Sequence, residues 1–568
     1  MINCYYRPDA ALALYIAPAE SALTSEELKA FLSEKLPQYM VPDTVTQLDA
    51  LPLSHNGKID RKSLPDPEPR SGDVVYTPPA SQLERTLCDI WETLLEVERI
   101  GRHDNFFQLG GHSLIASQLM FRIHRDTDLQ ISLRDLFEHP TVAEIAELGQ
   151  ADLGNAAAAP AHDVEVQAVP AAEDYPLSPA QVDIWLACNL HPDSVAYNIP
   201  GTYRFTGQLD MPALEEAVGR LVSRHAVLRT GITEKGGEPR QTVWPTVAPP
   251  LEKYDLSDHP FAETEAQRIS DEIMRRPFDF AEPPLFRMGV CTIDPALHIV
   301  VFSFHHLVFD GWSLGYFLRE LFECYDEARS GRPANPPAAL QYTDYAVWAA
   351  NRLTSDQMDS QREYWRNALT PIPSAVDLPL DRARSGAGDR TAAWKHSEIP
   401  PSVTTRFRTI AQQSNVTPFA VVLATLQIFL ARYSGQSEIS LGAVTSGRGH
   451  ANTDDILGLF LNNVVLRAEI SPDLSFDELV KQAQETLTAA LMNADYPLGH
   501  LIQDLRPDTE AGRSPFFDIL VDWQDDSLTG TDPSRIVRSD LKIEEIGDRH
   551  TDAKYDLVFY FRDRGQSI

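Results

Sequence analysis

The sequence predicts a multidomain α/β protein, and three observations lead to this fold class. The chain has 568 residues, which is too long for a single hydrophobic core. At about 150 residues per domain, three or four domains are expected. Two stretches rich in proline, alanine and polar residues, 65–79 and 151–173, have the composition of linkers. After the second linker, helical patterns alternate with strand-like runs, as is typical of α/β folds.

Residues 1–64 are predicted to form a small α+β domain. The segment "TSEELKAFLSEKL" has the spacing of a helix and is followed by Pro37, which cannot continue it. Two short strand-like runs come next. An Asn-Gly pair suited to a tight turn then precedes Lys58, which on its own is only a solvated charge.

Residues 80–150 are predicted to be entirely helical. The segment "SQLERTLCDIWETLL" places its large apolar side chains on one helix face, and "SLIASQLMFRIHR" does the same. The two faces consist of Leu83, Leu87, Ile90, Trp91 and Leu94, and of Leu114, Leu119, Met120 and Ile123. Two amphipathic helices in so short a piece indicate a small helix bundle.

Residues 174–568 carry the α/β pattern. Helical segments such as "MPALEEAVGRLVSRH" alternate with strand-like runs such as "LHIVVFSFHH" and "SEISLGAV". The run ending in His305 and His306 is almost continuously apolar, which predicts a strand buried on both faces. Histidines at the end of such a strand are placed to face a cleft.

Composition excludes several classes of function. The chain has 49 Lys and Arg against 82 Asp and Glu, a net charge of −33 that repels nucleic acid and anionic membranes. Its five cysteines are scattered without metal-ligand spacing, so we expect reduced thiols, no metal site and a cytoplasmic location. No apolar segment has membrane-spanning length.

Ser113 follows two glycines and a histidine in "FQLGGHSLIASQLM", and three interpretations compete for it. A nucleophile elbow needs G-x-S-x-G after a strand, and neither is present. A helix N-cap is an ordinary use of serine. An attachment point fits the glycines, which allow close approach of another protein, and a helix N-terminus that favours a phosphodiester. The segment alone leaves the last two open.

The histidine pair is also open when it is considered alone. His305 and His306 could be a buried pair in the core or, less favoured, two ligands of a metal site. A metal site needs further ligands, and the sequence has none at a characteristic spacing. Asp310 and Gly311 follow on the same loop, and Ser313 is expected to cap the helix that begins after it. The order is therefore strand, loop, helix.

Several motifs together resemble those of nonribosomal peptide synthetases. "DNFFQLGGHSLIASQL" resembles the carrier-protein signature, in which the serine, here Ser113, bears a 4'-phosphopantetheine arm. Residues 1–64 resemble the end of an adenylation domain through "LPQYMVP" and "NGKIDRKSL". The remainder resembles a condensation domain through "LSPAQVDIW", "RHAVLRT", "HHLVFDGWS", "YTDYAVW", "LGLFLNNVVLR" and "RSPFFDILV".

The resemblance implies a domain order and a fold for each domain. It implies an incomplete C-terminal adenylation subdomain (1–64), a four-helix-type peptidyl carrier bundle (80–150) and a condensation domain (174–568). The condensation domain is expected to have two lobes that resemble chloramphenicol acetyltransferase, at about 174–345 and 346–568, with an end that stops short of the family's usual length.

The resemblance also implies roles for the loop residues. His306, the second histidine, is expected to face the tunnel where the amide forms, as a base or as a group that positions the amine. His305 is expected to be structural, because successive side chains on a strand point to opposite faces. Asp310 is expected to hold the loop in shape through an ion pair with Arg448, and the Gly311 amide is a candidate oxyanion donor.

Lys58 matches the lysine that contacts the acyl carboxylate and nucleotide phosphate in adenylation domains. The sequence has no counterpart of the family's Ser/Thr/Gly-rich phosphate loop. We therefore do not expect this chain alone to activate amino acids.

Three partners are implied: a phosphopantetheinyl transferase, a large adenylation subdomain upstream, and a downstream aminoacyl carrier module.

Cyclisation domains carry aspartates in place of the histidine pair, and epimerisation domains depart from the "LGLFLNNVVLR" type of motif, so condensation is preferred to both. The alternative is a noncatalytic carrier and docking fragment with an inactive condensation lobe. Glycine in "ADYPLGHL" is a departure from the family pattern.

Overall fold

The computed structural model describes most of the chain after residue 75. The described residues are 76–95, 97, 99–106, 109, 119, 122, 123, 126, 127, 129, 131, 135, 136, 139–152, 166–381, 392–448, 452, 453, 455–507, 513–525, 540–546, 552–563 and 568, with three earlier strands. Lys58, Ser113 and the helix predicted from "TSEELKAFLSEKL" lie outside them.

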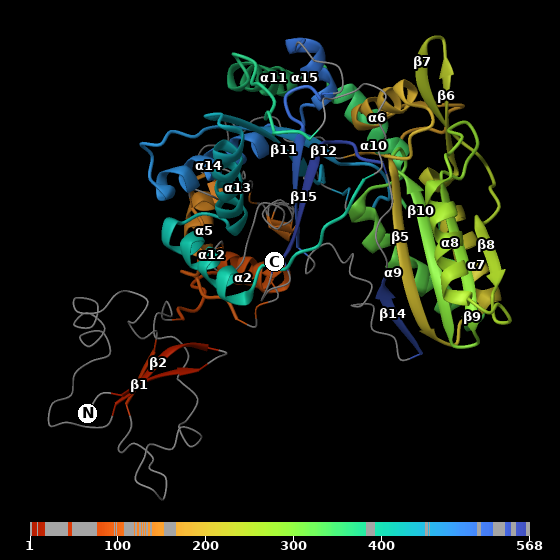
Figure 1. Ribbon diagram of the computed structural model, residues 1–568, viewed down its shortest axis with the longest axis horizontal. Coiled ribbons are helices and arrows are strands. Elements are labelled where there is room, and N and C mark those ends of the chain that lie inside the picture. Colours follow the sequence, from red (N-terminus) through yellow and green to blue (C-terminus); the bar gives the residue numbers. More distant parts are fainter. Residues whose placement is uncertain are drawn as a thin grey trace, which may run out of the picture.

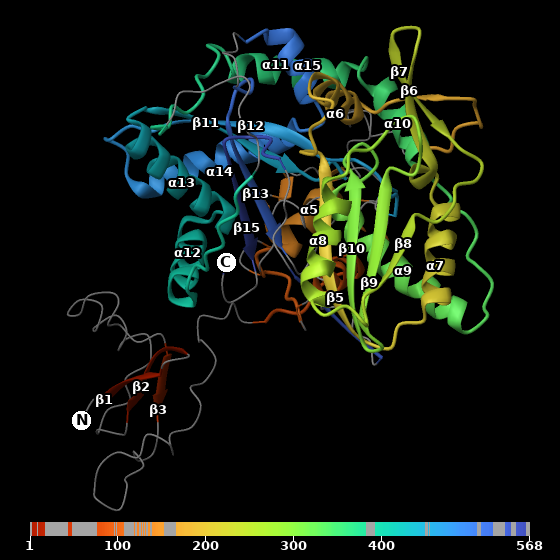
Figure 2. The same ribbon diagram turned by 45° about the vertical axis from the view of Figure 1, so that its right-hand side comes forward.

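The three earlier strands form a sheet of their own, drawn in red in Figure 2. They are β1 (Asn3–Arg7), β2 (Ala10–Ile16) and β3 (Thr44–Gln47). β1 is antiparallel to β2, and β2 is parallel to β3. The sequence placed strands only after the predicted helix, whereas β1 and β2 precede that segment.

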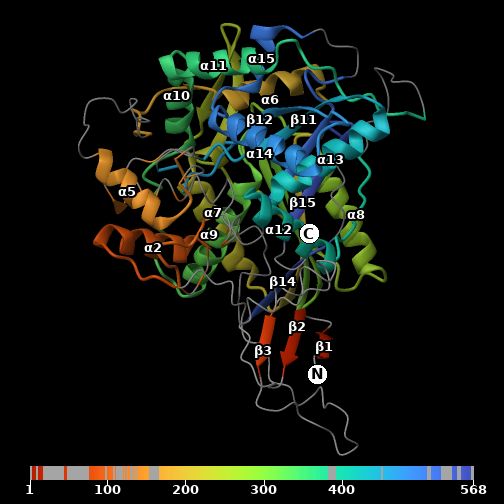
Figure 3. The ribbon, with the colours of Figure 1, turned by 90° about the vertical axis from the view of Figure 1, so that its left-hand side faces the viewer.

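Two helices and the residues between them build a separate hydrophobic core. α2 (Gln82–Leu95) packs against α5 (Val142–Asp152), as Figure 3 shows. Trp91 is fully buried and meets Phe106 edge-on, with ring centroids 5.2 Å apart. Leu119 and Ile123 enter the same core. The helix predicted at the start of this domain is confirmed, and α5 extends to Asp152, past the predicted domain end.

The first lobe of the large domain is a five-stranded sheet with helices on both faces (Figures 1 and 2). The strand order is β14-β5-β10-β9-β8. The strands are β5 (Asn198–Gly207), β8 (Leu251–Asp255), β9 (Phe286–Asp294), β10 (Leu297–His305) and β14 (Leu541–Glu545). α7 (Met211–Arg224) and α9 (Gly311–Arg329) cover one face, and α8 (Ala262–Arg275) covers the other.

The second lobe has a four-stranded sheet in the order β12-β11-β13-β15. Its strands are β11 (Glu438–Thr445), β12 (Asn462–Glu469), β13 (Ile519–Asp525) and β15 (Leu557–Asp563). β11, β13 and β15 are parallel, and β12 is antiparallel to β11. Its helices are α11 (Asp356–Ala368), α12 (Pro401–Ser414), α13 (Pro418–Ser434), α14 (Phe476–Met492) and α15 (Leu498–Leu505).

Smaller elements lie near the junction of the lobes. α6 (Pro179–Leu190) contacts both α10 (Tyr342–Arg352) and α15. A three-stranded sheet joins β4 (Tyr175–Pro176), β7 (Glu238–Val243) and β6 (Thr230–Lys235), and the short helix η3 (Ala226–Arg229) precedes β6. The lobes are therefore in contact through helices as well as through loops.

The two lobes do not follow chain order throughout. β14 lies in the last tenth of the sequence, yet it pairs with β5 at the edge of the first lobe's sheet (Figure 1). Leu541 and Ile543 of β14 are buried in the first lobe's core. The predicted boundary between the lobes at about residue 345 therefore places β14 in the wrong lobe. Sequence periodicity predicts a strand but does not reveal which sheet the strand joins.

Among the described residues, no single helix has the length and apolarity needed to cross a membrane. In that part of the chain, α12 and α13 pass such a test only when taken together, and they are bent by 106° relative to each other.

Candidate active site

β10 carries the histidine pair at the centre of the first lobe. It pairs with β5 on one side and β9 on the other, and its residues from His298 to His305 are buried. The prediction of a strand buried on both faces is therefore confirmed. The strand ends at His305, so His306 begins the loop that leads to α9.

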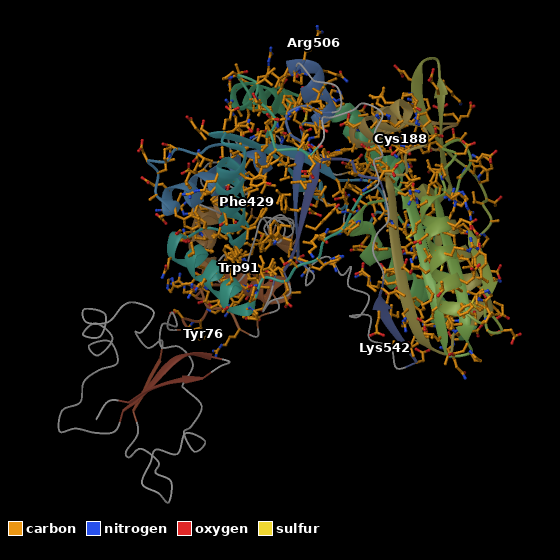
Figure 4. All side chains as sticks on the ribbon, in the orientation of Figure 1. Tyr76, Trp91, Cys188, Phe429, Arg506 and Lys542 are labelled. Atoms are coloured by element: carbon orange, nitrogen blue, oxygen red, sulfur yellow. The ribbon has the colours of Figure 1, made fainter. Side chains whose placement is uncertain are left out.

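His305 is packed into the protein interior. Its ring lies against Phe280, with centroids 4.7 Å apart, and its Nδ1 accepts the Leu307 N–H at 3.2 Å. Nε2 therefore carries the ring proton, and it lies 3.8 Å from the Cys188 sulfur on α6, labelled in Figure 4. Burial lowers the pKa of His305 to about 3, so the ring is neutral. These contacts are those of a structural side chain.

His306 has the opposite tautomer. Its Nδ1 lies 3.1 Å from the Phe309 carbonyl, which can only accept, so Nδ1 carries the proton. Burial first, and then the charge of Lys554, hold the pKa of His306 well below its ordinary value. The side chain is partly exposed. Nε2 is therefore left with an unshared electron pair on a neutral ring.

Asp310 is fully buried. Oδ1 accepts the Ser313 N–H at 2.7 Å, and Oδ2 accepts the Phe460 N–H at 3.0 Å. Arg448 Nη2 lies 3.4 Å from Oδ1. The structure thus contains the ion pair expected between Asp310 and Arg448, and it leaves no carboxylate oxygen open to a substrate.

Arg448 extends this network into the second lobe. Its Nη1 donates to the carbonyls of Thr453 and Ile456, both at 2.9 Å, and its Nη2 donates to Ser313 Oγ at 3.0 Å. The guanidinium also lies over the Phe460 ring, 4.0 Å from its centroid. The loop of the first lobe is therefore clamped to the segment that leads into β12.

The helix cap differs from the sequence-based expectation. α9 begins at Gly311, and its N-cap is Asp310, whose side chain accepts the Ser313 N–H. Ser313 was expected to be the cap, but its hydroxyl instead donates to the Gly458 carbonyl at 2.9 Å. Aspartate is as good a cap as serine, and it comes three residues earlier.

Gly311 is exposed at the N-terminus of α9. A Cβ at this position would have no atom within 4 Å. The position of a side chain at Gly311 is therefore open, and the N-terminus of a 19-residue helix favours negative charge nearby.

Three further residues at this site were not found from the sequence. The Tyr197 carbonyl accepts the His306 N–H at 2.9 Å, and Lys554 lies over the Tyr197 ring. Asp183 on α6 accepts the Gly499 N–H at 3.0 Å, which joins α6 to α15. A Cβ on Gly499 would lie 1.7 Å from that carboxylate, which gives a physical reason for the glycine in "ADYPLGHL".

The two-lobed fold with a histidine loop at the lobe junction defines a condensation domain. The family model described as Condensation domain matches residues 171–568, and the one described as Phosphopantetheine attachment site matches residues 85–148. The chain thus contains a carrier domain that bears 4'-phosphopantetheine, followed by a condensation domain.

The chain belongs to the nonribosomal peptide synthetase family. It is 33% identical over 98% of its length to malpibaldin synthetase of Mortierella alpina, and 33% identical over 95% of its length to gramicidin S synthase 2 of Brevibacillus brevis. It is 31% identical over 95% of its length to surfactin synthase subunit 1 of Bacillus subtilis. The chain spans 10%, 12% and 14% of the lengths of these three relatives.

Solved structures share the fold of the large domain. The X-domain of teicoplanin biosynthesis, in complex with OxyB, has a TM-score of 0.63 at 22% identity, over 71% of this chain and 87% of that one. The first condensation domain of the calcium-dependent antibiotic synthetase, bound to a substrate analogue, has a TM-score of 0.55 at 22% identity, over 69% and 89%. The two-lobed architecture resembling chloramphenicol acetyltransferase is therefore that of condensation domains.

Proposed function

We propose that this chain forms an amide bond between two thioester-linked substrates. The carrier domain presents the donor acyl group, and the condensation domain transfers it to the amine of an aminoacyl group on a downstream carrier. The observation that carries this proposal is the neutral His306 ring, with an unshared pair on Nε2, held beside a helix N-terminus at the junction of two lobes.

His306 manages the surplus proton of the attacking amine. As the amine nitrogen bonds to the thioester carbon, it becomes positively charged and must lose a proton. Nε2 accepts that proton or orients the amine by accepting its N–H, while Nδ1 stays bonded to Phe309. The C–S bond then breaks, and the departing thiolate receives the proton. Most of the remaining catalysis is the positioning of two tethered reactants.

The Gly311 amide and the N-terminus of α9 stabilise the negative charge that develops on the thioester oxygen. Gly311 is the exposed first residue of a long helix and has no side chain, so a substrate oxygen can approach its N–H. Asp310 and Arg448 keep this amide and His306 in place and touch neither reactant.

We further propose Ser113 as the attachment residue of the arm. It lies within the matched carrier region, between Leu109 and Leu119, which both contact the core built on α2 and α5. A serine hydroxyl is the group that forms the phosphodiester to 4'-phosphopantetheine, whose terminal thiol carries the acyl group.

Replacement of Ser113 by alanine should abolish both modification and transfer. Intact-mass measurement after incubation with coenzyme A and a phosphopantetheinyl transferase should show one addition to the parent chain and none to Ser113→Ala. Ser81→Ala is the control and should be modified like the parent, because Ser81 is partly buried and its Oγ only accepts the Glu84 N–H in the first turn of α2. An addition that persists in Ser113→Ala would remove the carrier assignment of this serine.

The resemblance of residues 1–64 supports a C-terminal adenylation subdomain that would act with a large upstream subdomain, with Lys58 as its functional lysine.

The noncatalytic alternative is less favoured, because the histidine loop and its clamp on the second lobe are intact. An assay of amide formation between an acyl group on this chain and a separate aminoacyl carrier discriminates between the two.

A further inference from the structure

A lysine near the end of the chain lies beside the histidine loop. Lys554 comes just before β15, and its Nζ lies 4.7 Å from the centroid of the Tyr197 ring. The same tyrosine ring meets the ring of His306 edge-on, with centroids 6.5 Å apart. One aromatic side chain therefore separates the ammonium group from the imidazole.

The charge of Lys554 has no carboxylate partner within the part of the chain that the structure describes. The residue is accessible to solvent, yet the surrounding protein lowers the pKa of its amino group to about 8. A cation without a carboxylate partner is expected to attract an anion that binds or forms beside it.

The electrostatic effect of Lys554 reaches the histidines. After burial itself, the Lys554 charge is the next cause that lowers the pKa of His305 and of His306. The same charge that disfavours a proton on His306 favours a negative charge placed near that ring.

We propose that Lys554 supplies the positive charge that stabilises the anionic intermediate of amide formation, an inference that rests on the proposed function. In the first step, the amine nitrogen bonds to the thioester carbon and the carbonyl π electrons move to oxygen. In the second, that oxygen re-forms its double bond, the C–S bond breaks, and the thiolate leaves with the amine's proton, passed on by His306. The Gly311 amide supplies a dipole to the oxygen, and Lys554 supplies a full charge.

Three variants test this role in the phosphopantetheinylated chain. Lys554→Met removes the charge at similar volume and should slow single-turnover amide formation about 10- to 100-fold, as expected for one charge near the reacting atoms. Lys554→Arg keeps the charge and should retain most of the rate. Lys542→Met alters an exposed lysine on β14, labelled in Figure 4, and should react at the parental rate.

The pH profile separates an electrostatic role from a structural one. An ammonium group is charged below its pKa, so the parent rate should fall as pH rises above about 8, where Lys554 loses its proton. The rate of Lys554→Arg should not fall above about pH 8, because arginine stays charged. The rate of Lys554→Met should be low at every pH and should not show this fall either. The acceptor amine also titrates in this range, but it is the same in every variant, so differences between profiles report the lysine.

The other groups around Lys554 do not titrate near pH 8. Burial raises the pKa of Cys188 and of Tyr197 to about 12, and raises that of Tyr555 further. The pKa of His305 is lowered to about 3, that of His306 is also lowered, and that of Asp183 is raised only to about 6.

A folded Lys554→Met chain with the parental rate and pH profile would overturn the inference. If Lys554→Met melts at a lower temperature than the parent, the Lys554→Arg variant decides. If the rate of amide formation by Lys554→Arg still falls above about pH 8, the inference is also overturned. If the parent and Lys542→Met both form no amide, the proposed function itself fails.

Discussion

His306→Ala should form little amide while it melts like the parent chain. Loss of a proton-handling or positioning group lowers a rate by about 10² to 10⁴. The residue is partly buried and its ring hydrogen-bonds the Phe309 carbonyl, so its removal should change stability by about 1 kcal/mol. The measurement is single-turnover transfer from acyl-loaded Ser113 to a separate aminoacyl carrier, with a melting curve for each variant.

His305→Ala is the matched control on the same strand end. His305 is buried between Phe278, Phe280 and Cys188, so its truncation leaves a cavity and should lower the melting temperature more than His306→Ala does. A folded His306→Ala chain that condensed at the parental rate would show that the ring is a spectator and that the mechanism is wrong.

Asp310→Ala should destabilise the condensation domain by about 3 to 5 kcal/mol, because it leaves the Arg448 charge buried without its partner. It also removes the acceptor of the Ser313 N–H at the start of α9 and that of the Phe460 N–H, which links the two lobes. Amide formation should fail as well, since the Gly311 amide and His306 lose their support. Urea unfolding of the chain measures the first effect, and the transfer assay measures the second.

Asp210→Ala separates capping from the rest of the network. Asp210 caps α7 by accepting the Ala213 N–H at 3.1 Å, but it is exposed and pairs with no arginine in the described residues. Its loss should cost about 1 kcal/mol and leave amide formation intact. Equal destabilisation by the two variants would show that the buried pair contributes nothing beyond a helix cap.

Local patterns were sufficient for the elements that carry the site. The continuous apolar run predicts β10, and the alternation of side chains along a strand predicts the different surroundings of His305 and His306. The helix spacing predicts α2 and the burial of Leu87 and Trp91. These features depend on residues that are neighbours in sequence, so periodicity reveals them.

The remaining features depend on contacts between distant segments. Tyr197 and Lys554 are 357 positions apart, and only the packing of both lobes brings them together. Asp183 and Gly499 likewise meet across the junction, with no periodic signal in either segment. The Asp310–Arg448 pair was expected only through the family resemblance, because the two residues lie on different lobes.

The pairing of β14 with β5 has a consequence for synthesis on the ribosome. The chain emerges from its N-terminus, so β5 and β10 leave the exit tunnel more than 200 residues before β14. Until then, the β5 edge has unpaired backbone groups, and an exposed strand edge promotes association with other chains. The first lobe therefore completes its sheet only after nearly all of the second lobe has been translated, which makes the interval between translation of β5 and translation of β14 a vulnerable stage for this lobe.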